Sequence, residues 1–191
     1  MSQSQSEKYQ TENNSEPNAG NSILTVQQFM ILASLQDLSY NPHSDIRQKQ
    51  LDCTLQILQS TGDQLTHGWP QIFEIVGSIN ESQNENLIRS SFQCLQLIIS
   101  DFLTSIPSLC LILCIDTTAK FASQTQELNV SLTAIGLLWN IADYLYSNQD
   151  KIRVVLNDNR NLNGSVNNQN SNVAQLCAFD CLWMGLFTRL G

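Results

Sequence analysis

The chain has few charged side chains and no concentrated positive charge. Only 14% of its 191 residues are charged, and 9 Lys and Arg stand against 17 Asp and Glu, which gives a net charge of -8. Nucleic acids and anionic lipid surfaces are bound mainly through clustered cations. We therefore expect no nucleic acid among the partners, and no anionic lipid surface as the main partner.

The sequence also lacks the short motifs that carry enzyme chemistry. It has no glycine-rich phosphate loop, no nucleophile elbow and no His-rich metal signature. His67 could act as a base, but no Ser or Cys nucleophile motif lies near it, so a turn or cap role is favoured. His43 follows a proline at the expected entry of a helix, where we expect an exposed side chain. The sequence predicts no catalytic residues, no cofactor and no enzymatic activity.

Six cysteines fall inside apolar helical patterns: Cys53, Cys94, Cys110, Cys114, Cys177 and Cys181. Cys110/Cys114 and Cys177/Cys181 are each four residues apart, which on a helix places two thiols on one face, as paired metal ligands could be. Structural zinc sites instead usually combine two close Cys-x-x-Cys sets. Because apolar residues surround these cysteines, burial as small hydrophobic residues is the favoured interpretation. Unpaired cysteines in such positions indicate a reducing compartment.

Two aspartates within helical patterns are candidate cation ligands. Asp101 and Asp143 could each bind a cation, but neither has a second carboxylate at ligand spacing. A position on a helix surface or at a cap is therefore favoured for both. The sequence predicts no metal site.

The first 22 residues are rich in Gln, Ser, Asn and Glu. We expect residues 1–22 to be a disordered tail, because so few apolar groups cannot offset the entropy of ordering them. This stretch has neither the basic start nor the apolar core of a secretory signal. The longest apolar run, Phe102 to Ile115, contains a proline and is shorter than the ~20 residues of a membrane span. We therefore expect a soluble, cytosolic protein.

Apolar residues at spacings of three and four define two long helices. Ser82 and Glu85 form a capping-box pattern, which predicts a helix from Gln83. Its apolar stripe consists of Ile88, Phe92, Leu95, Ile99 and Phe102. The second long helix has an equally regular stripe: Leu128, Leu132, Ile135, Trp139, Ala142 and Tyr146. Both stripes are predicted to be buried, and Trp139→Ala is then expected to cost about 3–5 kcal/mol.

Other local signals place the remaining helices. A shorter helix should start near Ile106, with Ser105 as its N-cap. It should be buried on several sides, because its apolar residues cover nearly its whole circumference: Leu109, Leu111, Ile112, Leu113 and Ile115. Ser44 is expected to cap a helix that ends at Gly62 in the left-handed conformation. Trp69 opens the next helix. An earlier helix, with Phe29, Leu32, Leu35 and Leu38 as its stripe, should end near Tyr40.

Helix hairpins begin near Leu24, Trp69 and Ile106, at intervals of about forty residues. This spacing predicts an all-α fold of stacked antiparallel helix hairpins, a HEAT/armadillo-like α-solenoid fragment. The helical-repeat domain is expected over residues 23–148, followed by an Asn-rich mobile loop over 149–172 and by the start of a further, truncated repeat over 173–191. The last helix should leave its stripe uncovered on the outer side: Leu176, Phe179, Trp183, Leu186 and Leu190.

Several segments are more specific than a generic helical pattern. They are the hexapeptide Leu65-Thr66-His67-Gly68-Trp69-Pro70 and residues 45–47, 50–56, 88–98, 100–103, 116–121, 129–140 and 182–184. These segments closely resemble the Mon-two family, large helical-repeat proteins of the Golgi that are related to the big Arf guanine-nucleotide exchange factors. The resemblance covers about residues 34–146 and resumes at 182–184.

This resemblance implies a piece of a much longer protein that is peripheral on trans-Golgi network and early endosome membranes. It implies a role in transport between these compartments, as a scaffold that works with a Dopey-type protein and with Arf-family GTPases. Family members resemble the exchange factors in their flanking helical regions but lack the catalytic exchange domain. A non-catalytic scaffold is therefore the first hypothesis, and a regulator of an Arf-family GTPase or its exchange factor is the second. The residues that bind partners are not identified by the sequence.

Overall fold

The computed structural model describes residues 19–78, 84–163 and 178–190, and their secondary structure is helical. Within these ranges there are eight α-helices and three short 3-10 helices (η): α1 (Ala19–Asp37), η1 (Leu38–Tyr40), α2 (Ser44–Thr61), η2 (Gly62–Gln64), α3 (Trp69–Gly77), α4 (Glu85–Asp101), η3 (Ser108–Cys110), α5 (Leu111–Ser123), α6 (Leu128–Ser147), α7 (Gln149–Asn163) and α8 (Ala178–Leu190).

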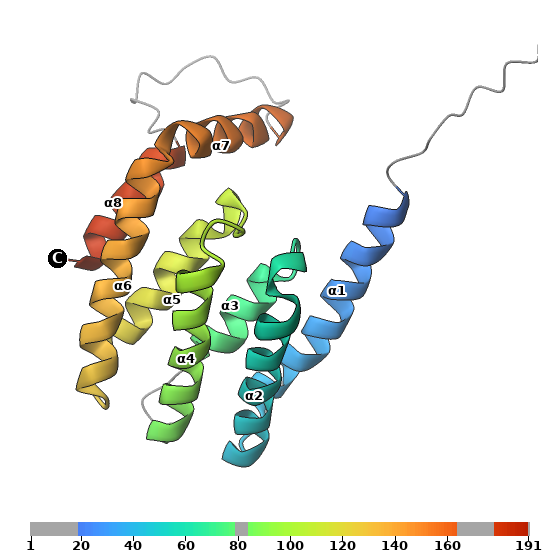
Figure 1. Ribbon diagram of the computed structural model, residues 1–191, viewed down its shortest axis with the longest axis vertical. Helices are drawn as coiled ribbons and strands as arrows, with labels where there is room; N and C mark the ends of the chain where they lie inside the picture. The colour runs from blue at the N-terminus through green and yellow to red at the C-terminus, as the bar shows by residue number, and fades with distance from the viewer. Residues whose placement is uncertain (1–18, 79–83, 164–177, 191) are drawn as a thin grey trace, which may run out of the picture.

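The helices form two layers of an α-solenoid (Figure 1). Layer A consists of α1, α3, α5 and α8, and each of these helices contacts the next one in that order. Layer B consists of α2, α4 and α6, which likewise contact one another in order. Helices that follow one another in the chain run in opposite directions from α1 to α6, and α7 crosses the end of the array. The predicted all-α stack of helix hairpins is confirmed.

The core lies between the two layers and is continuous from α1 to α8. Trp69 at the start of α3 is fully buried, as its ring lies 6.1 Å from that of Phe73 and 6.3 Å from that of Phe102. The indole nitrogen of Trp69 donates a hydrogen bond of 2.9 Å to the Leu65 carbonyl. The ring of Phe92 lies 5.3 Å from that of Phe121. The predicted stripe of α4 is thus buried along its whole length.

Two buried polar side chains connect the first hairpins. Arg47 of α2 donates to the carbonyl of Ser39 at 2.8 Å and to the carbonyl and hydroxyl of Ser78 at 3.2 and 2.7 Å. Gln50 donates to the carbonyl of Leu35 at 2.6 Å and to the Ser39 hydroxyl at 2.8 Å. Burial lowers the pKa of Arg47. Because a buried polar group must find partners, these side chains fix α2 against η1 and against the end of α3.

Gly62 differs from its prediction, since it lies in the right-handed helical region with φ -54°. Its lack of a side chain matters for another reason. A Cβ atom at this position would lie 2.4 Å from the ring of Phe102. The end of α4 can therefore approach the end of α2 only because residue 62 has no side chain.

Two helix starts also differ from the sequence-based expectation. Ser44 is the first residue of α2 and not its cap: His43 occupies the N-cap position, with an extended backbone and no side-chain capping bond. Helix α4 begins at Glu85 and not at Gln83, because Asn84 is extended and its side chain accepts a 2.9 Å hydrogen bond from the amide of Asn86. Asn is as effective a cap as Ser. Ser82 lies outside the described residues.

The helix predicted from Ile106 begins later. Backbone turns follow α4, Pro107 has a non-helical backbone with ψ 139°, and α5 begins at Leu111 after η3. As a result Leu109 is exposed, whereas Leu111 and Ile115 are completely buried. The predicted burial of this segment therefore holds for α5 but not for the turn before it.

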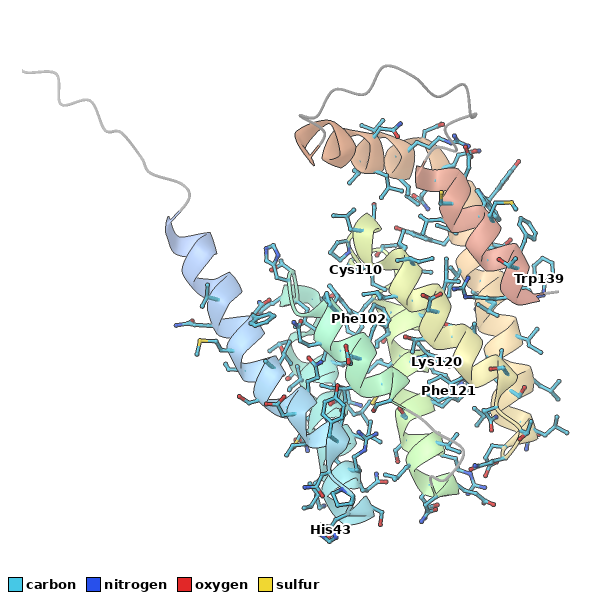
Figure 2. All side chains as sticks on the ribbon, turned by 180° about the vertical axis from the view of Figure 1, so that it is seen from behind. His43, Phe102, Cys110, Lys120, Phe121 and Trp139 are labelled. Carbon is cyan, nitrogen blue, oxygen red and sulfur yellow. The ribbon has the colours of Figure 1, made fainter. Side chains whose placement is uncertain are left out.

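Helix α6 turns the predicted stripe outward, so that five of its six residues are exposed. The exposed residues form the α6 outer face, defined as Leu128, Leu132, Ile135, Trp139 and Tyr146. Trp139, predicted in the core, is 57% exposed and lies at the edge of the array (Figure 2). Helix α6 has a second apolar face, and this one packs into the core: Val130, Ala134, Leu137, Leu138, Ile141 and Leu145.

The predicted tail and loop both contain helix. Helix α1 already begins at Ala19, and residues 149–163 of the expected Asn-rich loop form α7. Ile152 and Leu156 of α7 are buried, and Arg153 pairs with Asp180 of α8 at 3.1 Å. Packing against α8 thus stabilises a helix that its asparagines disfavour. Residues 1–18 and 164–177 lie outside the described residues, and the division of the chain into domains stays a prediction.

Helix α8 is covered better than predicted. Phe179 and Leu186 are completely buried, because α8 contacts α5, α6 and α7. The guanidinium of Arg153 lies 4.5 Å from the centre of the Phe179 ring. Phe29 and Leu38 of the first predicted stripe are in contrast exposed, and only Leu32 of that stripe is fully buried. Exposed apolar residues are therefore present at both ends of the array.

Candidate protein-binding cleft

A cleft of about 500 Å³ opens on layer A, where η1, α3 and α5 meet. Three successive hairpins contribute to it. Its lining residues are Ser39 and Tyr40 from η1, Pro70, Phe73, Glu74, Gly77 and Ser78 from α3 and its end, and Leu113, Asp116, Thr117 and Lys120 from α5. The site therefore exists only when the hairpins are stacked.

The close approach of α5 to the end of α3 forms one wall of the cleft. A Cβ atom on Gly77 would lie 3.3 Å from the hydroxyl oxygen of Thr117, so the two helices nearly touch here. The ammonium of Lys120 donates to the carbonyl of Gly77 at 3.3 Å. This contact satisfies one of the carbonyls that a helix leaves without a partner at its C-terminus. Figure 2 shows Lys120 on α5, in the layer nearer the viewer.

Charged and aromatic side chains surround the opening. Tyr40 is 77% exposed, and its hydroxyl donates to a carboxylate oxygen of Glu74 at 3.4 Å. Asp116 pairs with Arg189 of α8 at 2.5 Å. Arg47 holds two lining residues in place, since it donates hydrogen bonds to the backbone carbonyls of both Ser39 and Ser78. The walls are apolar and the opening carries both signs of charge, which suits a peptide segment with an apolar side chain and a charged neighbour.

The lining of the cleft lacks the residue types that most often act as activated nucleophiles and bases. It contains hydroxyl groups but no His or Cys among its lining residues. In residues 19–78, 84–163 and 178–190, no three His, Cys, Asp or Glu side chains form a group that could hold a metal ion.

The candidate residues named from the sequence lie outside this cleft. His43 and His67 are exposed, as expected for His43, and neither lines the cleft. Asp101 and Asp143 are exposed on α4 and α6. Among the described residues, neither aspartate belongs to a group of three or more side chains that could hold a metal ion.

The cysteines divide into two classes. Burial raises the pKa of the Cys94 thiol to about 12 and that of Cys114 to about 12, and it also raises the pKa of Cys110. These thiols therefore stay protonated and act as small apolar groups. The prediction of burial is wrong for Cys53 and Cys181, which are exposed. Cys177 lies outside the described residues.

Sequence patterns could not identify the cleft. Tyr40, Glu74 and Lys120 belong to three different hairpins and share no motif. One weak signal existed, because Tyr40 is an aromatic residue directly before the helix-breaking pair Asn41 and Pro42. An aromatic residue at such a turn is often half-exposed, but nothing in the pattern indicates which helix it approaches.

Comparison with known proteins places this array in a family. Residues 25–97 match the family model described as "Mon2/Sec7/BIG1-like, HDS". Residues 100–191 match the model described as "C-terminal region of Mon2 protein". A Drosophila melanogaster protein, "Protein MON2 homolog", is 53% identical over 165 residues. The chain belongs to the Mon2 family.

Other Mon2 relatives are more distant. The Homo sapiens "Protein MON2 homolog" is 44% identical over 86% of this chain, and the Saccharomyces cerevisiae "Protein MON2" is 30% identical over 68% of it. The chain spans only 10% of the length of each of these relatives and of the Drosophila protein. No solved structure matches it. None of the described helices of this Mon2-family chain is both long and apolar enough to cross a membrane.

Proposed function

We propose that this Mon2-family chain is a non-catalytic helical scaffold that acts by binding proteins in vesicle-mediated transport between the trans-Golgi network and endosomes. The observation that supports it is the cleft on layer A, which three successive hairpins build from apolar walls and a charged opening. Surfaces that run across several repeats are the usual binding surfaces of α-solenoids. The chain works on the cytosolic side, peripheral on trans-Golgi network and early endosome membranes through the longer protein.

The partner that we propose is a Dopey-type protein, which the Mon-two resemblance implies. A segment of it would place an apolar side chain against Phe73 and Leu113. A basic group beside it would lie near Glu74 and Tyr40, which form one side of the opening. Charged groups at the edge of an interface contribute mainly to specificity and to the rate of association.

Purified proteins test this proposal. Binding of the 191-residue chain to a Dopey-type protein would be measured by calorimetry, with Glu74→Lys as the variant and Asp101→Lys as its matched control. Both substitutions change an exposed acid to Lys, but Asp101 lies at the end of α4, outside the cleft. We expect Glu74→Lys to weaken binding about tenfold or more, and Asp101→Lys to leave it unchanged. Equal effects of the two variants, or no binding of the parent chain, would contradict the proposal.

One observation favours a second candidate, a regulator of an Arf-family GTPase or of its exchange factor. Residues 25–97 match a model whose description names Sec7 and BIG1-like proteins together with Mon2. No acidic finger-like loop that could displace Mg²⁺ and phosphate occurs in the sequence, so we expect no exchange activity from the chain alone. Nucleotide release from an Arf-type GTPase, measured with and without its exchange factor, separates the candidates. Stimulation only in the presence of the exchange factor would support the regulator.

A further inference from the structure

Most of the exposed apolar side chains lie at the two ends of the array, and Leu109 of η3 lies between them. Among the described residues, none of the large hydrophobic side chains on α2, α3, α4 or α5 is exposed. The exposed ones lie on α1 and η1, on η3, and on α6, α7 and α8: Val26, Phe29, Met30, Ile31, Leu38, Tyr40, Leu109, Leu128, Leu132, Ile135, Trp139, Tyr146, Val154, Val155, Met184 and Phe187. Helical-repeat arrays that end in water have polar terminal repeats. Neither end of this array has that character.

The α6 outer face is the most regular of these surfaces. Its residues follow one another by three, four or seven positions, so they form one continuous stripe along the helix. Leu128 and Tyr146, at its two ends, are 70% and 69% exposed. Asp143 is the only charged residue of α6, and it lies one turn from Trp139. A partner surface of matching chemistry is therefore an apolar stripe with a basic residue opposite Asp143.

Gly136 is an independent sign that another backbone approaches this face. It lies one turn after Leu132, in the middle of α6, and a Cβ atom on it would have no heavy atom within 4 Å. Glycine in a helix interior is unfavourable relative to alanine. Gly62 and Gly77 each lie against a packed neighbour, whereas no described residue explains Gly136. A covering helix that packs closely on α6 would explain it.

The order of the layers shows where such a helix would lie. Helix α3 contacts α2, the last helix of the preceding hairpin, and its own hairpin partner α4 then covers α2. Helix α8 contacts α6 in the same way. A helix that follows α8 as α4 follows α3 would cover the outer face of α6. Layer B would then contain α2, α4, α6 and this helix in order.

We propose that the α6 outer face is an internal surface of a longer array, covered by an amphipathic helix that follows α8 in the same polypeptide. The relatives support a source within one chain, since each is about ten times longer than the segment matched here. The covering helix runs antiparallel to α8, places apolar residues on Leu132 and Trp139, and approaches most closely at Gly136. This proposal does not depend on the proposed binding function of the layer A cleft.

The test compares the 191-residue chain with the same chain extended by about forty residues, one hairpin period, of the sequence that follows it in its own gene. Gly136→Leu should not lower the melting temperature of the 191-residue chain, but should lower that of the extended chain by about 4 °C or more. Leu132→Asp should behave in the same way. Gln93→Glu, which introduces a negative charge at an exposed position on α4, is the matched control and should change neither protein.

Trp139 supplies a second readout. The difference between each protein and its Trp139→Phe variant isolates the fluorescence of this side chain. In the 191-residue chain acrylamide should quench it freely, and in the extended chain quenching should fall several-fold. A stop codon directly after Gly191, or equal quenching in both proteins, would overturn the proposal. A dimer of the 191-residue chain that Leu132→Asp dissociates would also overturn it, because a second copy would then be the occupant.

Discussion

Helices α4 and α6 carry apolar stripes of the same regularity, yet one stripe is buried and the other is exposed. On α4 the residues that face away from the stripe are mostly polar, with the half-buried Leu97 among them, so one face dominates the contact with the core. Helix α6 is apolar on two faces, and the array buries the face that contains Ala134, Leu138 and Ile141. The comparison teaches that a periodic stripe identifies a contiguous apolar surface. It does not identify which neighbour, if any, covers that surface.

The largest expected effect concerns the α4 stripe. Phe92 is 5% exposed, and its ring packs 5.3 Å from that of Phe121. Phe92→Ala should therefore lower the free energy of unfolding by about 3–5 kcal/mol, because it removes a buried aromatic ring and leaves a cavity. Urea denaturation followed by circular dichroism measures the change. A loss below about 1 kcal/mol would remove the contrast between the two helices.

The next largest loss of stability is expected for a buried charged residue, Arg47. It extends the comparison, since α2 buries a charged side chain whereas α6 exposes a tryptophan. Arg47→Ala removes three hydrogen bonds from a charged donor. It should cost about 1.5–3 kcal/mol, because the acceptors at Ser39 and Ser78 lose their partner in a part-buried position. Lys49→Ala on the same helix is the control, since Lys49 is 83% exposed. Its denaturation midpoint should not move.

Two glycines allow a buried position to be compared with an exposed one, because a Gly→Ala substitution adds a single methyl group to each. Gly62→Ala should destabilise the chain by about 1–3 kcal/mol, because the new Cβ atom would overlap the buried ring of Phe102. Gly136→Ala should stabilise the 191-residue chain by about 0.5–1 kcal/mol, since it improves helix propensity in open space. Thermal unfolding of both variants would show opposite shifts. Shifts of the same sign would mean that the surroundings of one glycine differ from those described.

The smallest effect is expected at the residue that the sequence placed in the core. Trp139→Ala in the 191-residue chain should change the free energy of unfolding by less than about 0.5 kcal/mol, because the side chain is 57% exposed. A loss of about 3–5 kcal/mol, as expected for a buried tryptophan, would instead mean that another part of the protein covers Trp139. Chemical denaturation monitored by circular dichroism avoids the loss of the fluorescent group.

Most of the fold could be predicted from local patterns, because each hairpin packs mainly on its neighbours. The start of α3 at Trp69 and the α4 stripe both followed from residues close in sequence. Helix α7 was missed because its asparagines disfavour helix, and contacts of Arg153 with Phe179 and Asp180 stabilise it from 26 and 27 residues away. The candidate cleft could not be predicted either, since it combines three hairpins.

The contact between Gly62 and Phe102 also constrains how the sequence can change over evolutionary time. A side chain at position 62 can be accepted only after the ring at position 102 has been replaced by something smaller. The reverse order passes through an overpacked and destabilised intermediate. The two substitutions are therefore not independent: Phe102→Leu should be unfavourable alone, yet should make Gly62→Ala harmless. Among family members, a larger residue at the first position is expected together with a smaller one at the second.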